Sequence, residues 1–206
     1  MMYRKERISM SKIKVVTIGR LYCSGGSSIG KKVAEKLGIP CYDREIVEMA
    51  AEKSGISMAE IKKFEESVLN PMKKPINIFG NSVDICEKIF AAETEVVYEL
   101  VEKGPCVIVG RCADFILKNK VKTLDVFIYS SLDKRMQTAM SEPHNIPADE
   151  VETRLKKYDK KRGDYYNSNT NKKWGTKFSY DLCLDSGALG YDMCADIIAH
   201  TVEASR

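Results

Sequence analysis

The sequence Gly19-Arg-Leu-Tyr-Cys-Ser-Gly-Gly-Ser-Ser-Ile-Gly30 joins two segments of different periodicity. The segment before it, 13–18, is rich in β-branched residues, which suits a buried strand. After it, Ile29, Val33 and Leu37 stand four apart, which is helical spacing. A strand, a glycine- and serine-rich turn and a helix form the layout of a phosphate-binding loop. The turn lets N–H groups converge on an anion, and the helix N-terminus adds partial positive charge.

The loop departs from the usual motif, which reads G-x-x-x-x-G-K-[ST]. Gly25-Gly26-Ser27-Ser28 places a glycine where the motif has its lysine. Ser27 or Ser28 could supply the hydroxyl that such loops direct at Mg²⁺. The loop alone therefore favours phosphate binding, with a plain strand–turn–helix connection as the alternative.

Length and composition predict one soluble domain. The chain has 206 residues, of which 30% are charged and 44% hydrophobic. We expect a disordered or adventitious tail at 1–12, with Met10 as an alternative start, and a single domain at 13–206. No apolar run approaches the roughly 18 residues of a membrane span, and the polar N-terminus lacks a signal core. The sequence therefore predicts a cytoplasmic protein.

Charge and cysteine usage exclude some classes of function. The net charge of +4 gives no strong argument for nucleic-acid binding by itself. The seven cysteines include no C-x-x-C pair, which fits a reducing compartment better than a disulfide scaffold. Structural zinc is disfavoured because His144 and His200 are isolated from any cysteine cluster.

Strand-like and helix-like segments alternate along the chain, which predicts a parallel sheet covered on both faces. The fold class expected is three-layer α/β/α with five parallel strands. The apolar segment 106–110 should lie in the middle of the sheet. The expected strands are 13–18, 39–42, 106–110, 121–129 and 179–184, and the expected helices are 31–37, 44–54, 57–68, 81–103, one opened by 130–131, and 190–203, with a turn at 185–189.

Charged residues follow several of the expected strands. Asp43 could cap the helix 44–54 or contact a ligand, because ligands in open α/β sheets bind at the carboxyl ends of strands. Arg111 and Asp114 come directly after the apolar strand, which favours a functional role for Arg111 over a structural ion pair. Arg135 is either a surface charge or a guanidinium near a nucleotide.

The segment 153–177 is the most basic part of the chain, with nine Lys or Arg against two Asp. Lys157, Lys161 and Asp164 share one side of a helix, and tyrosines and a tryptophan are interleaved. Three interpretations stay open: a solvated helix face, a nucleic-acid interface, or a mobile lid over 145–177 whose cations close over phosphates.

Six sequence blocks, in this order, extend the comparison to the region 13–203. They are Ile18-Gly-Arg-x-Tyr-x-Ser-Gly-Gly26 with Ile29-Gly30-Lys31, Ile39-Pro-x-Tyr-Asp-Arg-Glu-Ile46, Val109-Gly-Arg-x-Ala-Asp114, Asp159-Lys-Lys-Arg162 with Tyr165-Tyr166, Lys173-Trp-Gly175, and Tyr180-Asp-Leu-Cys-Leu184. Together they resemble the nucleoside monophosphate kinases, and most closely the cytidylate kinase-like family of P-loop proteins. The family loop usually reads G-R-x-Y-G-S-G-G-R-E-I-G; here Cys23 replaces a glycine and Ser27-Ser28 replace Arg-Glu.

The resemblance implies an ATP-dependent phosphotransferase that uses Mg²⁺. The β- and γ-phosphates would lie on the backbone of the loop, with Mg²⁺ near Ser27 or Ser28. The adenine would rest near Arg135 and the turn 185–189. The loop residues implied in nucleotide binding are Gly19, Arg20, Ser24, Gly25, Gly26, Ser27 and Ser28.

On the acceptor side the resemblance implies a small nucleotide, CMP or dCMP, between the helical segment 43–103 and the sheet. Arg111 would grip its phosphate in bidentate fashion, with Asp43 and Asp114 as further substrate contacts. Lys161 and Arg162 from the lid, together with Arg135, would stabilise the transferring group. The alternatives are a nucleotide sensor with a degenerate loop and a nucleic-acid binder acting through 153–177. No membrane partner is expected, and a homo-oligomer stays open.

Overall fold

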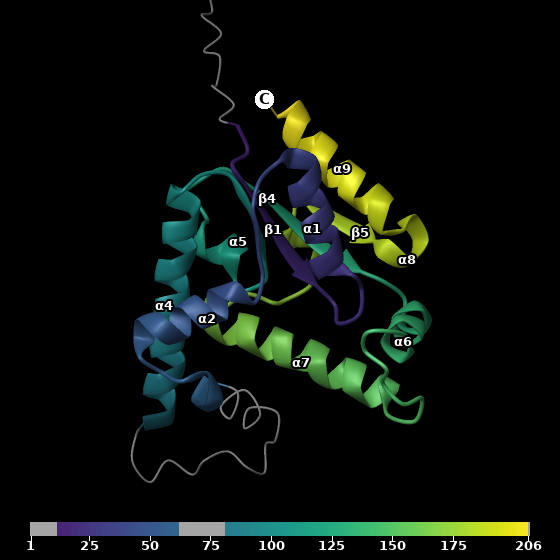
Figure 1. Ribbon diagram of the computed structural model, residues 1–206, viewed down its shortest axis with the longest axis horizontal. Helices are drawn as coiled ribbons and strands as arrows, with labels where there is room; N and C mark the ends of the chain where they lie inside the picture. Colours follow the sequence, from purple (N-terminus) through teal and green to yellow (C-terminus); the bar gives the residue numbers. More distant parts are fainter. Residues whose placement is uncertain (1–11, 62–80, 206) are drawn as a thin grey trace, which may run out of the picture.

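The computed structural model describes residues 12–61 and 81–205, and it confirms a five-stranded parallel sheet with helices on both faces (Figure 1). The strand order is β2-β3-β1-β4-β5, and every neighbouring pair is parallel. The strands are β1 (Val15–Arg20), β2 (Cys41–Tyr42), β3 (Cys106–Val109), β4 (Thr123–Tyr129) and β5 (Leu182–Asp185). The central strand of the sheet is β1, and β3 lies beside it. The apolar composition of β3 reflects its burial on both faces of the sheet.

The described helices follow the predicted alternation with the strands. They are α1 (Gly26–Leu37), α2 (Glu45–Ser54), α4 (Asn81–Glu102), α5 (Ala113–Ile116), α6 (Leu132–Met140), α7 (Val151–Thr170), α8 (Ser186–Leu189) and α9 (Tyr191–Ala204), with a 3₁₀ turn at Lys177–Ser179. The predicted helix 57–68 begins at 58, and its part beyond 61 lies outside the described residues. The expected turn at 185–189 is the short helix α8, because the Asp185 carboxylate accepts from the N–H groups of Gly187 and Ala188.

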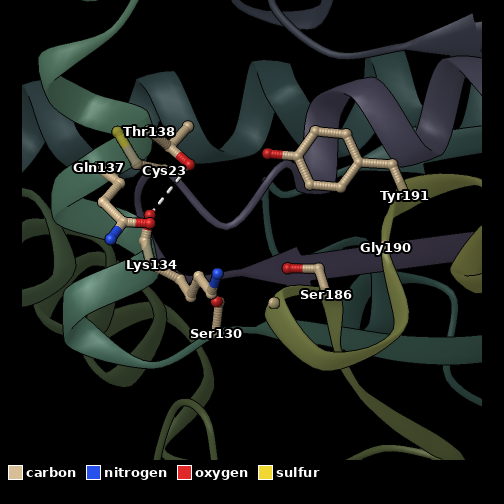
Figure 2. Close-up of a pocket in the computed structure, with 9 residues that line it drawn as sticks. Cys23, Ser130, Lys134, Gln137, Thr138, Ser186, Gly190 and Tyr191 are labelled. Carbon is tan, nitrogen blue, oxygen red and sulfur yellow. Dashed lines mark hydrogen bonds between the residues drawn. The ribbon is translucent and has the colours of Figure 1, made fainter.

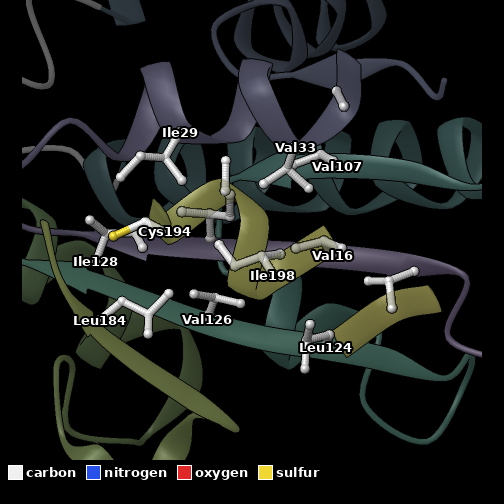
Figure 3. Close-up of a cluster of buried hydrophobic side chains, with 14 of the residues drawn as sticks. Val16, Ile29, Val33, Val107, Leu124, Val126, Ile128, Leu184, Cys194 and Ile198 are labelled. Atoms are coloured by element: carbon white, nitrogen blue, oxygen red, sulfur yellow. The ribbon is translucent and has the colours of Figure 1, made fainter. Parts of the chain in front are cut away.

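Alternate residues of β1 face opposite layers, which divides the core in two. Val16 and Ile18 pack with α1 and α9, including Val33 and Ile198 (Figure 3). Val15 packs with α2, α4 and α5 on the other face. Each fully buried Val or Ile side chain contributes about 1.5–3 kcal/mol relative to exposure, so the sheet is held rigidly between two layers.

The long helix α7 lies across the end of the sheet where the strands stop (Figure 1). That end also holds the turn between β1 and α1 and the turn after β3. In the part of the chain that the structure describes, no helix is both long and apolar enough to cross a bilayer. The fold therefore concentrates several loops and one basic helix at a single edge, where ligands of open α/β sheets bind.

Candidate functional site

The loop between β1 and α1 presents an uncapped helix N-terminus. Gly25 is the N-cap residue, with φ of +78°, and no side chain caps the helix. The first N–H groups of a helix have no partner within it, so this end is suited to an anion. A Cβ on Gly25 would lie 2.2 Å from the ring of Tyr191, so only glycine fits there.

The three serines of the loop differ in accessibility. The Ser24 hydroxyl is buried, 2.9 Å from the Leu21 carbonyl oxygen and 3.1 Å from that of Ile128, so it stabilises the loop internally. Ser27 is half-buried and Ser28 is exposed, both in the first turn of α1. Among the described residues there is no group of three His, Cys, Asp or Glu side chains that could hold a metal. The hydroxyls of Ser27 and Ser28 are accessible oxygen groups of the kind that Mg²⁺ prefers.

Asp43 does not cap α2, contrary to one of its two expected roles. The N-cap is Arg44 and has no side-chain cap. Asp43 instead accepts from Arg20 Nη2 at 2.9 Å, across 23 positions of the chain. The guanidinium at the end of β1 therefore takes the carboxylate in a charge-assisted hydrogen bond.

Arg20 is itself in a strongly cationic environment. Its side chain is only 16% exposed, and its pKa is lowered to about 9 by burial and by the nearby charge of Arg162. Arg111 also lowers the pKa of Arg20, while Asp43 raises it. We call Arg20, Arg111 and Arg162 the arginine cluster. Like charges held close together are costly unless an anion joins them.

Arg111 is held in place by an unusual turn and a buried carboxylate. Arg111 and Cys112 both have φ of +55°, and the N–H of Ala113 donates to the Gly110 carbonyl at 3.2 Å. Such conformations cost on the order of 1–3 kcal/mol each for residues other than glycine, and they gather at functional sites. Arg111 Nη1 donates to Glu93 Oε1 at 3.1 Å, and the Glu93 side chain is 0% exposed.

Arg162 reaches the loop from α7. Its Nη1 donates to the Arg20 carbonyl at 3.1 Å, and its guanidinium lies 5.4 Å from the centre of the Tyr22 ring. Burial lowers its pKa. The two arginines predicted for the acceptor and for the lid, Arg111 and Arg162, are therefore both close enough to Arg20 to lower its pKa. Lys161, its neighbour on α7, is half-buried.

The predicted lid, α7, is docked on the loop. Asp159 accepts from the Tyr22 N–H at 2.7 Å through one oxygen and from Arg135 Nη1 at 2.6 Å through the other. Arg135 also donates to the Tyr22 carbonyl at 3.2 Å and is only 8% exposed. Arg135 is therefore not a surface charge, and in its described contacts it holds the loop and α7 together.

Aromatic residues of α7 are used in packing. The Tyr166 hydroxyl donates to Asp114 at 2.6 Å, and the Tyr165 hydroxyl donates to Glu93. Burial raises the pKa of Asp114. In its described contacts Asp114 thus anchors α7, whereas the sequence predicted a substrate contact. Tyr158 stacks on the Tyr22 ring with centroids 4.3 Å apart.

Sequence reasoning missed Glu93. It lies among the apolar positions of α4, with Ile89, Val96, Val97 and Leu100 buried around it. A single acidic residue in an apolar stripe was the available signal, because a buried charge needs a partner. Its partners, Arg111 and Tyr165, lie far along the chain and could not be identified from spacing.

A cavity of about 270 Å³ opens beside the loop (Figure 2). Tyr191 points across it toward Cys23 and the helix α6. Its floor includes the Ser130 hydroxyl, which is buried and has no hydrogen-bond partner among the described residues. The lining residues are Cys23, Ser130, Lys134, Gln137, Thr138, Ser186, Gly187, Gly190 and Tyr191. An aromatic wall and a few polar groups are typical of a small-molecule site.

Solved structures share this architecture. An uncharacterized protein from Eubacterium ventriosum superposes with a TM-score of 0.69 at 26% identity, covering 92% of this chain and 98% of that one. Shikimate kinase from Acinetobacter baumannii, solved in complex with shikimate, gives 0.54 at 14% identity, covering 94% and 95%. Shikimate kinase from Bacteroides thetaiotaomicron gives 0.55 at 13%, covering 92% and 98%. At such identities the two kinases show a shared fold.

Comparison of sequences completes the assignment. No curated protein matches this chain. The family model described as the cytidylate kinase-like family, however, matches residues 15–188. That range contains the loop, the arginine cluster, α7 and most of the cavity lining. The chain belongs to the cytidylate kinase-like family.

Proposed function

We propose that this chain transfers the terminal phosphoryl group of ATP to a small phosphate-bearing acceptor, with CMP or dCMP as the first candidates. The observation that carries the proposal is the contact between two features: an anion-binding loop with an uncapped helix, and a cluster of three arginines that touches it. Membership of a kinase-like family and the fold shared with shikimate kinases support nucleotide-dependent phosphotransfer.

The donor nucleotide would occupy the loop and the cavity next to it. Backbone N–H groups at 23–28 would bind the β- and γ-phosphates, and the base would enter the cavity beside Tyr191. Bound Mg²⁺ would neutralise charge on the phosphates, with Ser27 or Ser28 as its protein ligand. Lys134 lines the same cavity from α6 (Figure 2) and takes the place near the base that the sequence suggested for Arg135.

The acceptor would bind on the other side of the arginine cluster, toward α2 and α4. Glu93 fixes the orientation of Arg111, so that the guanidinium offers a defined geometry to the acceptor phosphate. Asp43, beside this side of the site, pairs with Arg20 at 2.9 Å. An acceptor phosphate oxygen would attack the terminal phosphorus, and the bond from that phosphorus to the bridging oxygen would break, leaving ADP.

Charge stabilisation and positioning are the main demands of this reaction. Arg162 reaches the reacting region while it is anchored to the loop backbone, and Lys161 stands next to it on α7. One arginine placed on the transferring group can contribute on the order of 10³-fold or more in rate. The cations of α7 would therefore supply the positive charge that phosphoryl transfer requires.

The nucleic-acid alternative loses support from the outer face of α7. Three of its basic residues are paired with acids one turn away: Arg154 with Glu150, Lys156 with Glu152 and Lys160 with Asp164. The tyrosines contact protein groups, which leaves them poorly placed for stacking on bases. A nucleotide sensor is the second candidate, because Gly26 replaces the lysine of the motif.

A coupled assay of ADP release tests the proposal across CMP, dCMP, UMP, AMP and GMP with Mg²⁺-ATP. We expect turnover with at least one acceptor, and Arg111→Met should raise its KM by about tenfold or more, because a bidentate contact to phosphate is lost. Arg154→Met is the matched control, since Arg154 is about half exposed and pairs with Glu150 on the outer face of α7. ATP binding without turnover on any acceptor would contradict the kinase and favour the sensor.

A further inference from the structure

Two residue types in the loop are exchanged relative to the standard motif. In G-x-x-x-x-G-K-[ST], placed so that its final serine is Ser27, the first glycine falls at position 20 and the lysine at position 26. This chain has Arg20 and Gly26 at those positions. The cation and the glycine have therefore changed places.

The two positions are in direct contact. A Cβ built on Gly26 would lie 2.5 Å from the Cβ and 2.7 Å from the Cγ of Arg20. Real Cβ atoms do not approach so closely, so the stem of Arg20 fills the space that any side chain at position 26 would need. Position 26 is glycine because Arg20 passes over it.

The guanidinium of Arg20 lies between the turn after β3 and the residue that follows β2. Its Nη1 would be 2.1 Å from a Cβ on Gly110, in the turn after β3, where φ is +82°. Its Nη2 donates to Asp43 at the end of β2. The head group thus lies among the carboxyl ends of β1, β2 and β3, which is where open α/β sheets bind their ligands.

The same head group is incompletely satisfied. Arg20 Nε is buried, and no residue that the structure describes accepts a hydrogen bond from it. Leaving a buried charged donor unpaired is costly, and Arg162 and Arg111 add like charge around it. A phosphate oxygen would supply the missing acceptor and offset the repulsion.

We propose that Arg20 is the cation that binds the terminal phosphates of the nucleotide in place of the motif's lysine, and that Gly26 is its steric counterpart. The inference rests on the nucleotide site proposed above. Asp43 then has two effects: it orients Arg20, and it competes with phosphate for the same guanidinium.

Calorimetric affinities for AMP, ADP and ATP with Mg²⁺ measure what each phosphate contributes, without any turnover. Wild type should bind ATP more tightly than AMP. In Arg20→Met that gain should fall by at least about tenfold, because charge-assisted bonds to phosphate are lost, while AMP affinity stays unchanged. Arg154→Met should leave all three affinities as in wild type.

Two further variants separate phosphate binding from a structural role for Arg20. Asp43→Asn removes the competing carboxylate and should raise ATP affinity by about threefold; a purely structural pair would make Asp43→Asn and Arg20→Met equally harmful. The double variant R20G/G26K restores Gly-Leu-Tyr-Cys-Ser-Gly-Lys-Ser at 20–27. It should recover the ATP gain that Arg20→Gly alone loses.

The outcomes distinguish this inference from the proposed reaction. An ATP gain that survives in Arg20→Met, or a double variant no better than Arg20→Gly, overturns the role of Arg20 even if the wild type turns over acceptors. A gain that depends on Arg20 in a protein with no turnover supports the role of Arg20 and contradicts only the kinase reaction.

Discussion

Replacing Glu93 by glutamine perturbs the deepest polar contact of the site. The Glu93 side chain is 0% exposed and Arg111 is 26% exposed. Glutamine keeps the shape of Glu93, but it has one acceptor oxygen where the carboxylate uses two, one for Arg111 and one for Tyr165, and the charge is lost. Breaking a buried ion pair costs about 3–5 kcal/mol. Because water reaches Arg111, we expect a loss of about 2–3 kcal/mol in the free energy of unfolding.

Urea and thermal unfolding measure this loss. A change of that size lowers Tm by about 4–12 °C, since 1 kcal/mol corresponds to about 2–4 °C in a domain of this length. Glu99→Gln is the matched control on the same helix: Glu99 pairs with Lys53 and is 47% exposed. Exposed pairs contribute little, so its Tm should stay close to that of wild type.

A double-mutant cycle with Tyr165→Phe identifies the contact responsible. Tyr165 donates to Glu93, so the two substitutions should be coupled by about 0.5–3 kcal/mol. Equal Tm values for Glu93→Gln and Glu99→Gln, or no coupling with Tyr165→Phe, would refute the claim that Glu93 joins α4, α7 and the turn after β3.

Three other substitutions have defined outcomes. Burial raises the pKa of Asp125 to about 6 from 3.8, so the folded state binds this proton more tightly, and the stability contribution of Asp125 falls as the pH rises from 3.8 to about 6. Asp125→Asn should therefore raise the free energy of unfolding by up to about 3 kcal/mol at pH 7, since each pKa unit corresponds to about 1.4 kcal/mol, and leave it unchanged near pH 3, as measured by urea titration; a gain of equal size at both pH values would contradict this. Asp159→Asn leaves the buried Arg135 without its charged partner, so hydrogen exchange along α7 should accelerate about tenfold or more; unchanged exchange would show that α7 is held by other contacts. Gly110→Ala places a methyl group against the guanidinium of Arg20, so ATP affinity should fall as in Arg20→Met, and an unchanged affinity would show that Arg20 can move aside freely.

Hydrophobic periodicity was sufficient to predict the fold class, because each strand and helix buries a contiguous set of apolar residues. The five parallel strands and the layers of helices follow directly from that pattern. The order of the strands in the sheet could not be predicted from the same pattern. A fully apolar strand is buried on both faces, but β1 and β3 both satisfy that condition, and pairing with β4 decides which one is central.

The sequence predicted which backbone segments form the site, but not which side chains pair with one another. Placement after strand ends brought Arg111, Asp43 and the loop to one edge. Partner choice depended on contacts between distant positions: Asp43 pairs with Arg20, and Arg135 pairs with Asp159. The expected roles were a helix cap or a ligand contact for Asp43, and a surface charge or a position near a nucleotide for Arg135. In the structure each of these side chains forms a tertiary ion pair, which spacing along the chain could not identify.

Asp159 binds the loop with one oxygen and Arg135 with the other, so α6, α7 and the loop behave as one mechanical unit. Moving α7 away from the loop would break both hydrogen bonds of the Asp159 carboxylate and leave the buried Arg135 guanidinium without its charged partner. The cavity beside Tyr191 does not depend on such a movement, because none of its lining residues lies on α7. The segment that the sequence suggested as a mobile lid is therefore tied, through Asp159, to the very loop and helix that it would have to leave.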